Sequence, residues 1–129
     1  YVTEYKYKNY NKALLLYKEA LSEDPGYRLS DLYINIGRCH RLLGNHKKSI
    51  EKLTEVANSS LYYSIDAHYE LAMTYKEKGN IKKAINHIDL MLEHYKHADP
   101  TLIKVNRAKT LKEELNKQLL KKFPLCVLS

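Results

Sequence analysis

LYINIGRCHRLLGNHKKSIEKLTEVA, residues 32–57, is the stretch that decides the fold. Ile36, Leu43 and Leu53 recur at helical spacing, and Gly44 interrupts the pattern in its middle. Glycine suits the end of a helix because it adopts the left-handed conformation without a Cβ clash. The stretch therefore predicts two helices folded back on each other.

The same pattern returns about 35 residues later, with AHYELA at 67–72 and KGNIKKAI at 78–85. A helical hairpin that repeats at this period is typical of a solenoid, in which each hairpin buries its apolar face against the next. We therefore predict an all-α chain built from stacked antiparallel helix pairs.

The composition is ordinary for a folded chain, with 44% hydrophobic and 29% charged residues among 129. No apolar run approaches the roughly 20 residues that a membrane-spanning helix needs. Two cysteines, Cys39 and Cys126, are too few for a disulfide framework, which favours an intracellular, cytoplasmic protein. Because the chain begins with Tyr1 rather than Met, we take it as a fragment of a longer protein.

The net charge of +7 is unevenly distributed. Residues 1–100 are nearly balanced, whereas residues 101–129 carry seven basic residues against two acidic ones. The basic character therefore belongs to the last predicted helix, which weakens any argument from total charge to nucleic-acid binding by the repeats.

Proline and glycine positions suggest how the chain is divided. Asp24-Pro25-Gly26 ends the first segment, and Asp99-Pro100 opens a last helix with Asp99 as its N-cap. The predicted units are a partial first repeat at 1–28 (one helix ending near residue 8 and a second over 9–22), a second repeat at 29–61, a third repeat at 62–98, a capping helix at 99–123 and a tail at 124–129.

Aromatic, small and apolar residues fall in register in the three units. They are Tyr10, Ala13, Tyr17, Ala20 and Pro25 in the first, Tyr33, Ile36 and Gly37 in the second, and Leu71, Ala72, Tyr75 and Ala84 in the third. In this arrangement residues 1 to about 97 resemble the tetratricopeptide repeat (TPR) family. The resemblance implies a right-handed α-solenoid of about two and a half repeats followed by a C-terminal capping helix.

Small residues mark the places where the resemblance brings two helices into contact. They are Ala20, Gly37, Ala72 and Ala84. A glycine inside a helix costs about 1 kcal/mol relative to alanine. We expect Gly37 to be tolerated because it lets the neighbouring helix approach closely.

No pattern points to catalysis, a metal or a cofactor. The glycines stand in turns, at helix ends or in packing, and none builds a phosphate-binding loop. His94 and His97, with His87 nearby, lack a fixed fourth ligand, and we expect His94 and His97 to face solvent. Cys39 and His40 point about 100° apart on a helix and cannot share a proton, so Cys39 is expected in the core.

The resemblance implies a binding role, because the first helix of each TPR lines a concave groove that holds peptides or partner helices. We therefore predict a protein–protein interaction scaffold without a small-molecule substrate. Carried over by position, the groove residues are Asp31, Ile34, Asn35, Arg38 and Arg41 from the second repeat, and Asp66, Tyr69, Glu70, Met73 and Lys76 from the third.

Two features of this set suggest how a partner is held. Tyr69 and Met73 lie one turn apart and form an apolar patch. Arg38 and Arg41 suit a carboxylate, although a solvated face is the alternative for each charge.

One subtype of the family holds the acidic C-terminus of heat-shock chaperones in a clamp of Lys, Asn and Arg. Asn35 matches that clamp, but Asp66 and Glu70 stand where the clamp has basic residues. We therefore expect the groove to repel such a ligand.

Two alternatives to the scaffold remain open. One is a peptide-sensing domain of a larger bacterial regulator or sensor. The other is a module that contacts nucleic acid through its basic C-terminal helix, with tyrosines stacking on bases.

The last four residues, Cys126-Val127-Leu128-Ser129, have the C-a-a-X form of a farnesylation signal. Lys121 and Lys122 just before them suit anionic lipid. Lipidation of Cys126, and with it a membrane contact, requires that Ser129 is the native C-terminus; the alternative is a plain tail.

Overall fold

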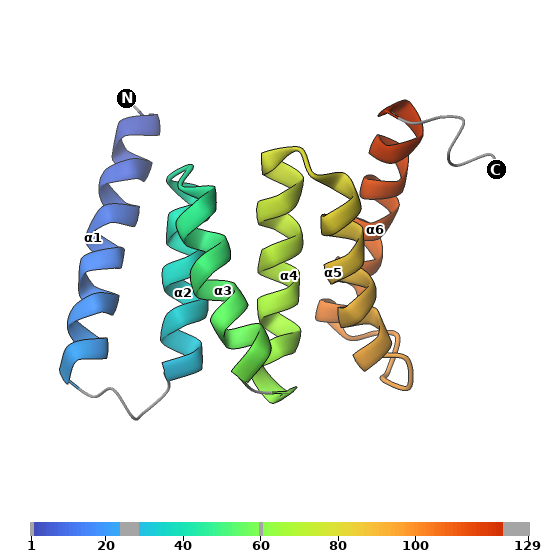
Figure 1. Ribbon diagram of the computed structural model, residues 1–129, viewed down its shortest axis with the longest axis horizontal. Coiled ribbons are helices and arrows are strands. Elements are labelled where there is room, and N and C mark those ends of the chain that lie inside the picture. The colour runs from blue at the N-terminus through green and yellow to red at the C-terminus, as the bar shows by residue number, and fades with distance from the viewer. Residues whose placement is uncertain (1, 24–28, 60, 123–129) are drawn as a thin grey trace.

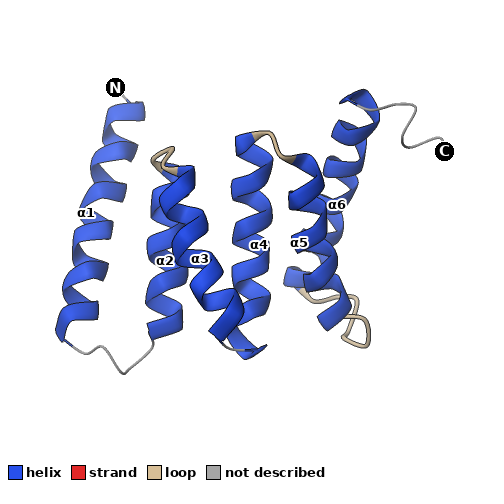
Figure 2. Ribbon diagram, in the orientation of Figure 1, coloured by secondary structure: helices blue, strands red, loops and turns tan. Residues whose placement is uncertain are grey.

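The computed structural model describes residues 2–23, 29–59 and 61–122, and the tail that contains Cys126 lies outside this part of the chain. Within it every regular element is a helix (Figure 2). The helices are α1 (Val2–Glu23), α2 (Leu29–Leu42), α3 (His46–Ser59), α4 (Leu61–Lys78), α5 (Ile81–His94) and α6 (Ile103–Lys122).

The helices stand side by side in chain order, and each runs antiparallel to the one before it (Figure 1). Each packs against the next along the chain, and α2 also contacts α4 directly. The all-α array of stacked helix pairs predicted from the periodicity is therefore confirmed.

Two glycines close the hairpins in the same way. Gly44 has a φ of 85° and Gly79 a φ of 92°, both in the left-handed region. Beyond each glycine an asparagine N–H reaches back to the preceding helix, from Asn45 to the His40 carbonyl at 2.7 Å and from Asn80 to the Tyr75 carbonyl at 2.8 Å. These bonds satisfy carbonyls that the helix end leaves free. The prediction that Gly44 and Gly79 stand at helix ends is thus confirmed.

Two predicted helix boundaries were wrong. Residues 2–23 form a single helix rather than one helix ending near residue 8 and another over 9–22, since no glycine, proline or cap separates them. The last helix begins at Ile103, so Asp99 is not its N-cap. The Asp99 carboxylate instead accepts hydrogen bonds from the Thr101 N–H at 2.9 Å and hydroxyl at 2.8 Å, which also lower the Asp99 pKa.

The core consists of three clusters that follow each other along the array. The first joins α1 to α2, the second joins α2, α3 and α4, and the third joins α4, α5 and α6. Cys39 is buried in the first cluster as predicted, and burial raises the pKa of its thiol. His94 and His97 are exposed, as expected.

The first helix contributes little to this core. Leu14 is its one buried residue among those whose side chains are described, and Leu15 is 63% exposed. Ala72 and Ala84 are fully buried where helices cross, but Ala20 is exposed, so its predicted packing role was wrong. Ala13, Leu14 and Tyr17 pack in the cluster shared with α2, whereas Ala20, one turn further along α1, is left exposed.

Two helices, α2 and α3, approach each other closely at Gly37. A Cβ added there would lie 2.6 Å from Cγ and 2.8 Å from Cδ2 of Leu53, which is itself fully buried in α3. The predicted reason for a mid-helix glycine is therefore confirmed.

A pair of histidines joins α4 to α5. His68 Nδ1 lies 3.0 Å from His87 Nδ1, so one ring donates its proton and the other accepts it. The His87 ring also stacks on Tyr75, with centroids 5.5 Å apart. Burial, together with the positive charges of His68 and Lys83, lowers the His87 pKa to about 4, and burial also lowers the pKa of His68.

We predict that Gly37→Ala destabilises the chain by about 1–2 kcal/mol, because overpacking at Leu53 outweighs the gain in helix propensity. In a Leu53→Ala background the same change should cost nothing or stabilise, since the clash is gone. Urea unfolding of the four proteins of this cycle measures the coupling.

Gly44→Ala is the matched control. Its cost, about 1–2 kcal/mol, arises from the backbone alone, because nothing lies within 4 Å of the added Cβ. That cost should be the same in the wild type and in the Leu53→Ala background. Equal costs of Gly37→Ala in both backgrounds would contradict the packing explanation.

We also predict that stability falls as the pH drops below about 6.5, the ordinary histidine pKa. The fold holds His87 neutral with a lowered pKa, so the unfolded chain binds its proton first, and the stabilisation present above pH 6.5 is lost progressively toward pH 4. This contribution amounts to about 2 kcal/mol between pH 7 and 4.5.

His87→Gln removes the titrating group and keeps a hydrogen-bonding side chain. Between pH 7 and 4.5 this variant should therefore lose about 2 kcal/mol less stability than the wild type loses. His97→Gln changes an exposed histidine and should follow the wild type. Parallel pH curves for the wild type and His87→Gln would exclude the His68–His87 pair as the cause.

Candidate functional site

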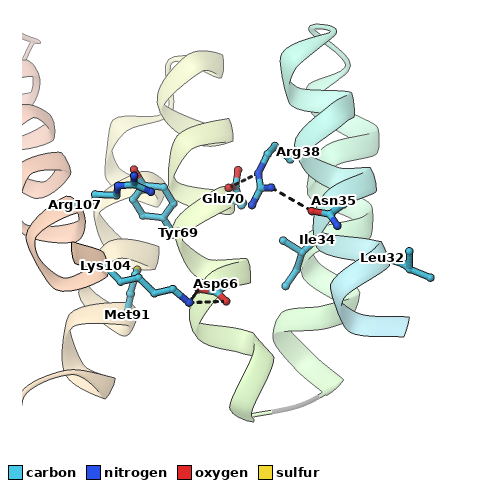
Figure 3. A pocket seen from close by; sticks show the side chains of 10 residues that line it. All are labelled: Leu32, Ile34, Asn35, Arg38, Asp66, Tyr69, Glu70, Met91, Lys104 and Arg107. Carbon is cyan, nitrogen blue, oxygen red and sulfur yellow. Dashed lines mark hydrogen bonds and ion pairs between the residues drawn. The ribbon is translucent and has the colours of Figure 1, made fainter. Parts of the chain in front are cut away.

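Two neighbouring cavities open on one face of the array, along α2, α4 and α6. The first encloses about 430 Å³ and the second about 380 Å³. Tyr69 and Arg107 line both, so we treat the cavities as one groove. The first is lined by Leu32, Ile34, Asn35, Arg38, Asp66, Tyr69, Glu70, Met91, Lys104 and Arg107 (Figure 3). The second is lined by Tyr69, Met73, Lys76, Ile103, Asn106, Arg107, Thr110, Leu111 and Glu114.

Helical spacing places these residues on the groove side. In α4, Asp66, Tyr69 and Met73 recur every three or four residues and form one face. The buried residues Ala67 and Leu71 lie beside that face and point into the core. One helix thus supplies both the packing of the array and a wall of the groove.

The structure brings together most of the residues that the sequence assigned to a groove. The first cavity is lined by Ile34, Asn35, Arg38, Asp66, Tyr69 and Glu70, and the second by Tyr69, Met73 and Lys76. Arg41 lines neither cavity. Asp31 lies in α2, but its side chain is outside the described part of the structure. Whether these residues contact a partner stays a prediction.

The arginines of α2 already hold carboxylates of α4. Arg38 Nε donates to Glu70 at 2.9 Å, and its Nη1 donates to Asn35 at 3.2 Å. Arg41 lies 2.7 Å from Glu77 and 3.4 Å from Glu70. The Arg41 side chain is only 11% exposed, whereas that of Arg38 is 44% exposed. The carboxylates that these arginines hold in the structure belong to the chain itself, and of the two arginines only Arg38 lines the groove. That either of them holds a carboxylate of a partner stays a prediction.

Sequence reasoning missed the wall formed by α6. The last helix was predicted to be a C-terminal cap that follows the repeats, yet its Lys104 and Arg107 line the groove. Lys104 Nζ lies 3.1 Å from Asp66, and Lys76 Nζ lies 2.8 Å from Glu114, so ion pairs join α4 to α6 on both sides of Tyr69.

The signal for this wall was present in the spacing of α6. Its polar residues Arg107, Thr110 and Glu114 recur every three or four positions, beside a separate stripe of buried apolar residues. That stripe is Val105, Ala108, Leu111 and Leu115. A helix with two such stripes faces two neighbours and is more than a cap.

Among the residues that the structure describes, no cluster of three or more His, Cys, Asp or Glu side chains is arranged to bind a metal ion. No helix in this part of the chain is long and apolar enough to cross a membrane. The Cys126 lipidation signal lies outside it.

Residues 65–93, which cover most of α4 and α5, match the family model described as tetratricopeptide repeat. Over 87 residues, 64% of this chain, the sequence is 37% identical to a TPR repeat-containing protein of Methanocaldococcus jannaschii. The matched region spans 25% of that protein's length. No solved structure matches the chain. The match over α4 and α5, the likeness to the archaeal protein and the array of helix pairs support the assignment of the chain to the tetratricopeptide repeat family.

Proposed function

We propose that the groove between α2, α4 and α6 binds a segment of a partner protein, as a peptide or a helix, and that the chain is an interaction scaffold. Tetratricopeptide repeats generally mediate protein–protein interaction, and proteins of the family are typically not enzymes. The kind of partner has to be inferred from the side chains that line the groove.

The observation that carries the proposal is the mixture of side chains along the groove. Apolar surface is accessible in both cavities, from Leu32 in the first and from Met73 and Ile103 in the second. Ile103 is 69% exposed although it is large and apolar. Such side chains surrounded by polar ones are typical of a surface that a partner covers.

The shape supports an elongated ligand. Because the two cavities meet at Tyr69 and Arg107, a bound segment fills both only if it runs past these two side chains. Tyrosine and arginine are enriched at the centres of protein interfaces, where they contribute much of the binding energy. A peptide or helix several residues long satisfies this geometry better than a small molecule does.

A nucleic-acid contact through α6 receives less support. Lys104 and Lys112 form ion pairs with Asp66 and Asp89, and Lys122 donates to the Gly79 carbonyl. Three of the basic residues of this helix are thus held by the chain itself. A peptide-sensing domain remains an alternative that would use the same groove.

We predict that the double variant Leu32→Ser/Ile103→Ser weakens peptide binding at least tenfold. Each substitution removes apolar contact area in one cavity, and together they should cost about 2 kcal/mol. The probes are peptides selected by the whole chain from a random dodecapeptide display library, and their dissociation constants are measured by fluorescence anisotropy.

The matched control is Leu90→Ser/Leu120→Ser, which changes two exposed leucines that line neither cavity. This variant should bind like the wild type, and circular dichroism should show both double variants folded. Selected peptides that bind the Leu32→Ser/Ile103→Ser variant undiminished would place the binding site elsewhere. A selection that enriches no peptide would also count against the proposal.

A further inference from the structure

We infer that Arg107 is the anchor for an acidic side chain, Asp or Glu, inside the partner segment that occupies the groove. The inference rests on the proposed function, since it names the chemistry of the ligand for the same site. It follows from the balance of charges along the groove and from the place of Arg107 within it.

Every charged side chain that lines the two cavities is paired across helices, with the exception of Arg107. Among the residues that the structure describes, Arg107 has no ion pair or side-chain hydrogen bond. The pairs are Arg38 with Glu70 at 2.9 Å, Lys104 with Asp66 at 3.1 Å and Lys76 with Glu114 at 2.8 Å. The groove therefore presents one uncompensated positive charge.

The carboxylates beside Arg107 do not oppose an acidic ligand as their sequence positions suggested. Glu70 is only 7% exposed and lies close to two arginines, and Asp66 is held by Lys104. Their charges are neutralised locally, so the field that a ligand meets in the groove is dominated by Arg107. The expectation that Asp66 and Glu70 repel an acidic ligand therefore loses its physical basis.

The position of Arg107 favours an acidic side chain inside the ligand over the carboxylate at the ligand's C-terminus. Arg107 and Tyr69 lie where the two cavities meet, and they line both of them. A C-terminal carboxylate bound at Arg107 would leave one cavity empty, because the chain ends there. An internal Asp or Glu lets the ligand continue on both sides, with apolar residues against Leu32 in one cavity and Ile103 in the other.

The guanidinium group suits this role chemically. It stays protonated, and its planar array of N–H groups donates to both oxygens of a carboxylate in a bidentate pair. Because no group of the described chain competes for these donors, binding does not first require an existing ion pair to break. An asparagine in the ligand has the same shape but lacks the charge, and therefore isolates the contribution of Arg107.

The test uses the whole chain, immobilised, and three pools of synthetic nonapeptides. In two pools the peptides are acetylated and amidated, the central residue is either Asp or Asn, and the flanking positions draw on Leu, Ile, Phe, Ala and Ser. The third pool has Asn at the centre and a free C-terminal carboxylate. Mass spectrometry quantifies what the wild type, Arg107→Gln and Lys109→Gln retain.

Lys109→Gln is the matched control. It removes the same charge from an exposed position of the same helix that lines neither cavity. We expect the wild type and Lys109→Gln to retain the Asp pool at least tenfold over the Asn pool, about 1.4 kcal/mol. In Arg107→Gln the ratio should fall to about one.

An Asp preference that persists in Arg107→Gln, or a wild type that retains Asp and Asn equally, overturns the role of Arg107. In those cases the proposed function still stands if retention is lost in Leu32→Ser/Ile103→Ser. Retention of the free-carboxylate pool in preference to the Asp pool overturns the choice of an internal side chain. If no pool is retained, the inference and the proposed function fail together.

Discussion

The approach of Gly37 to Leu53 sets the distance between α2 and α3, and the groove depends on that distance. Leu53 is fully buried and belongs to the cluster that joins α2, α3 and α4. With α3 held close to α2, the next helix α4 comes to lie beside α2 and contacts it directly. The side chains of α2 that reach α4, Arg38 and Arg41, do so because of this spacing. A larger residue at Gly37 would separate the helices at the centre of the array.

Ion pairs across the groove also join the helices, but they contribute less to stability than the packing does. Those with exposed partners, such as Lys104 with Asp66, contribute about 0–1 kcal/mol each and do not hold the fold. Glu70 differs because its side chain is buried and needs its arginine partners to offset the loss of hydration. The pairs therefore matter chiefly for charge: they remove most of it from the groove and leave that of Arg107.

The sequence was sufficient for most of the fold because the features that define it are local. A left-handed glycine at residue 44 or 79 and an apolar stripe at helical spacing are visible without any knowledge of distant contacts. Pairs across helices could not be predicted, because they depend on how far one helix is displaced along another. His68 and His87, for example, are 19 residues apart and meet through the antiparallel alignment of α4 and α5. Arg38 was predicted to line a groove and does line the first cavity, but a pattern does not give the residue opposite, and its partner on α4 was not foreseen.

The last helix, α6, contributes both to the core and to the groove. One stripe of α6, with Ala108 and Leu115 fully buried, completes the core cluster of α4 and α5. The adjacent stripe, with Lys104 and Arg107, completes the groove. The two stripes meet at Leu111, which belongs to the core and also lines the second cavity, but the charged residues that face the groove lie outside the core. The charge of Arg107 has no ion-pair partner in the described chain, and this is why we assign it to the recognition of a partner segment.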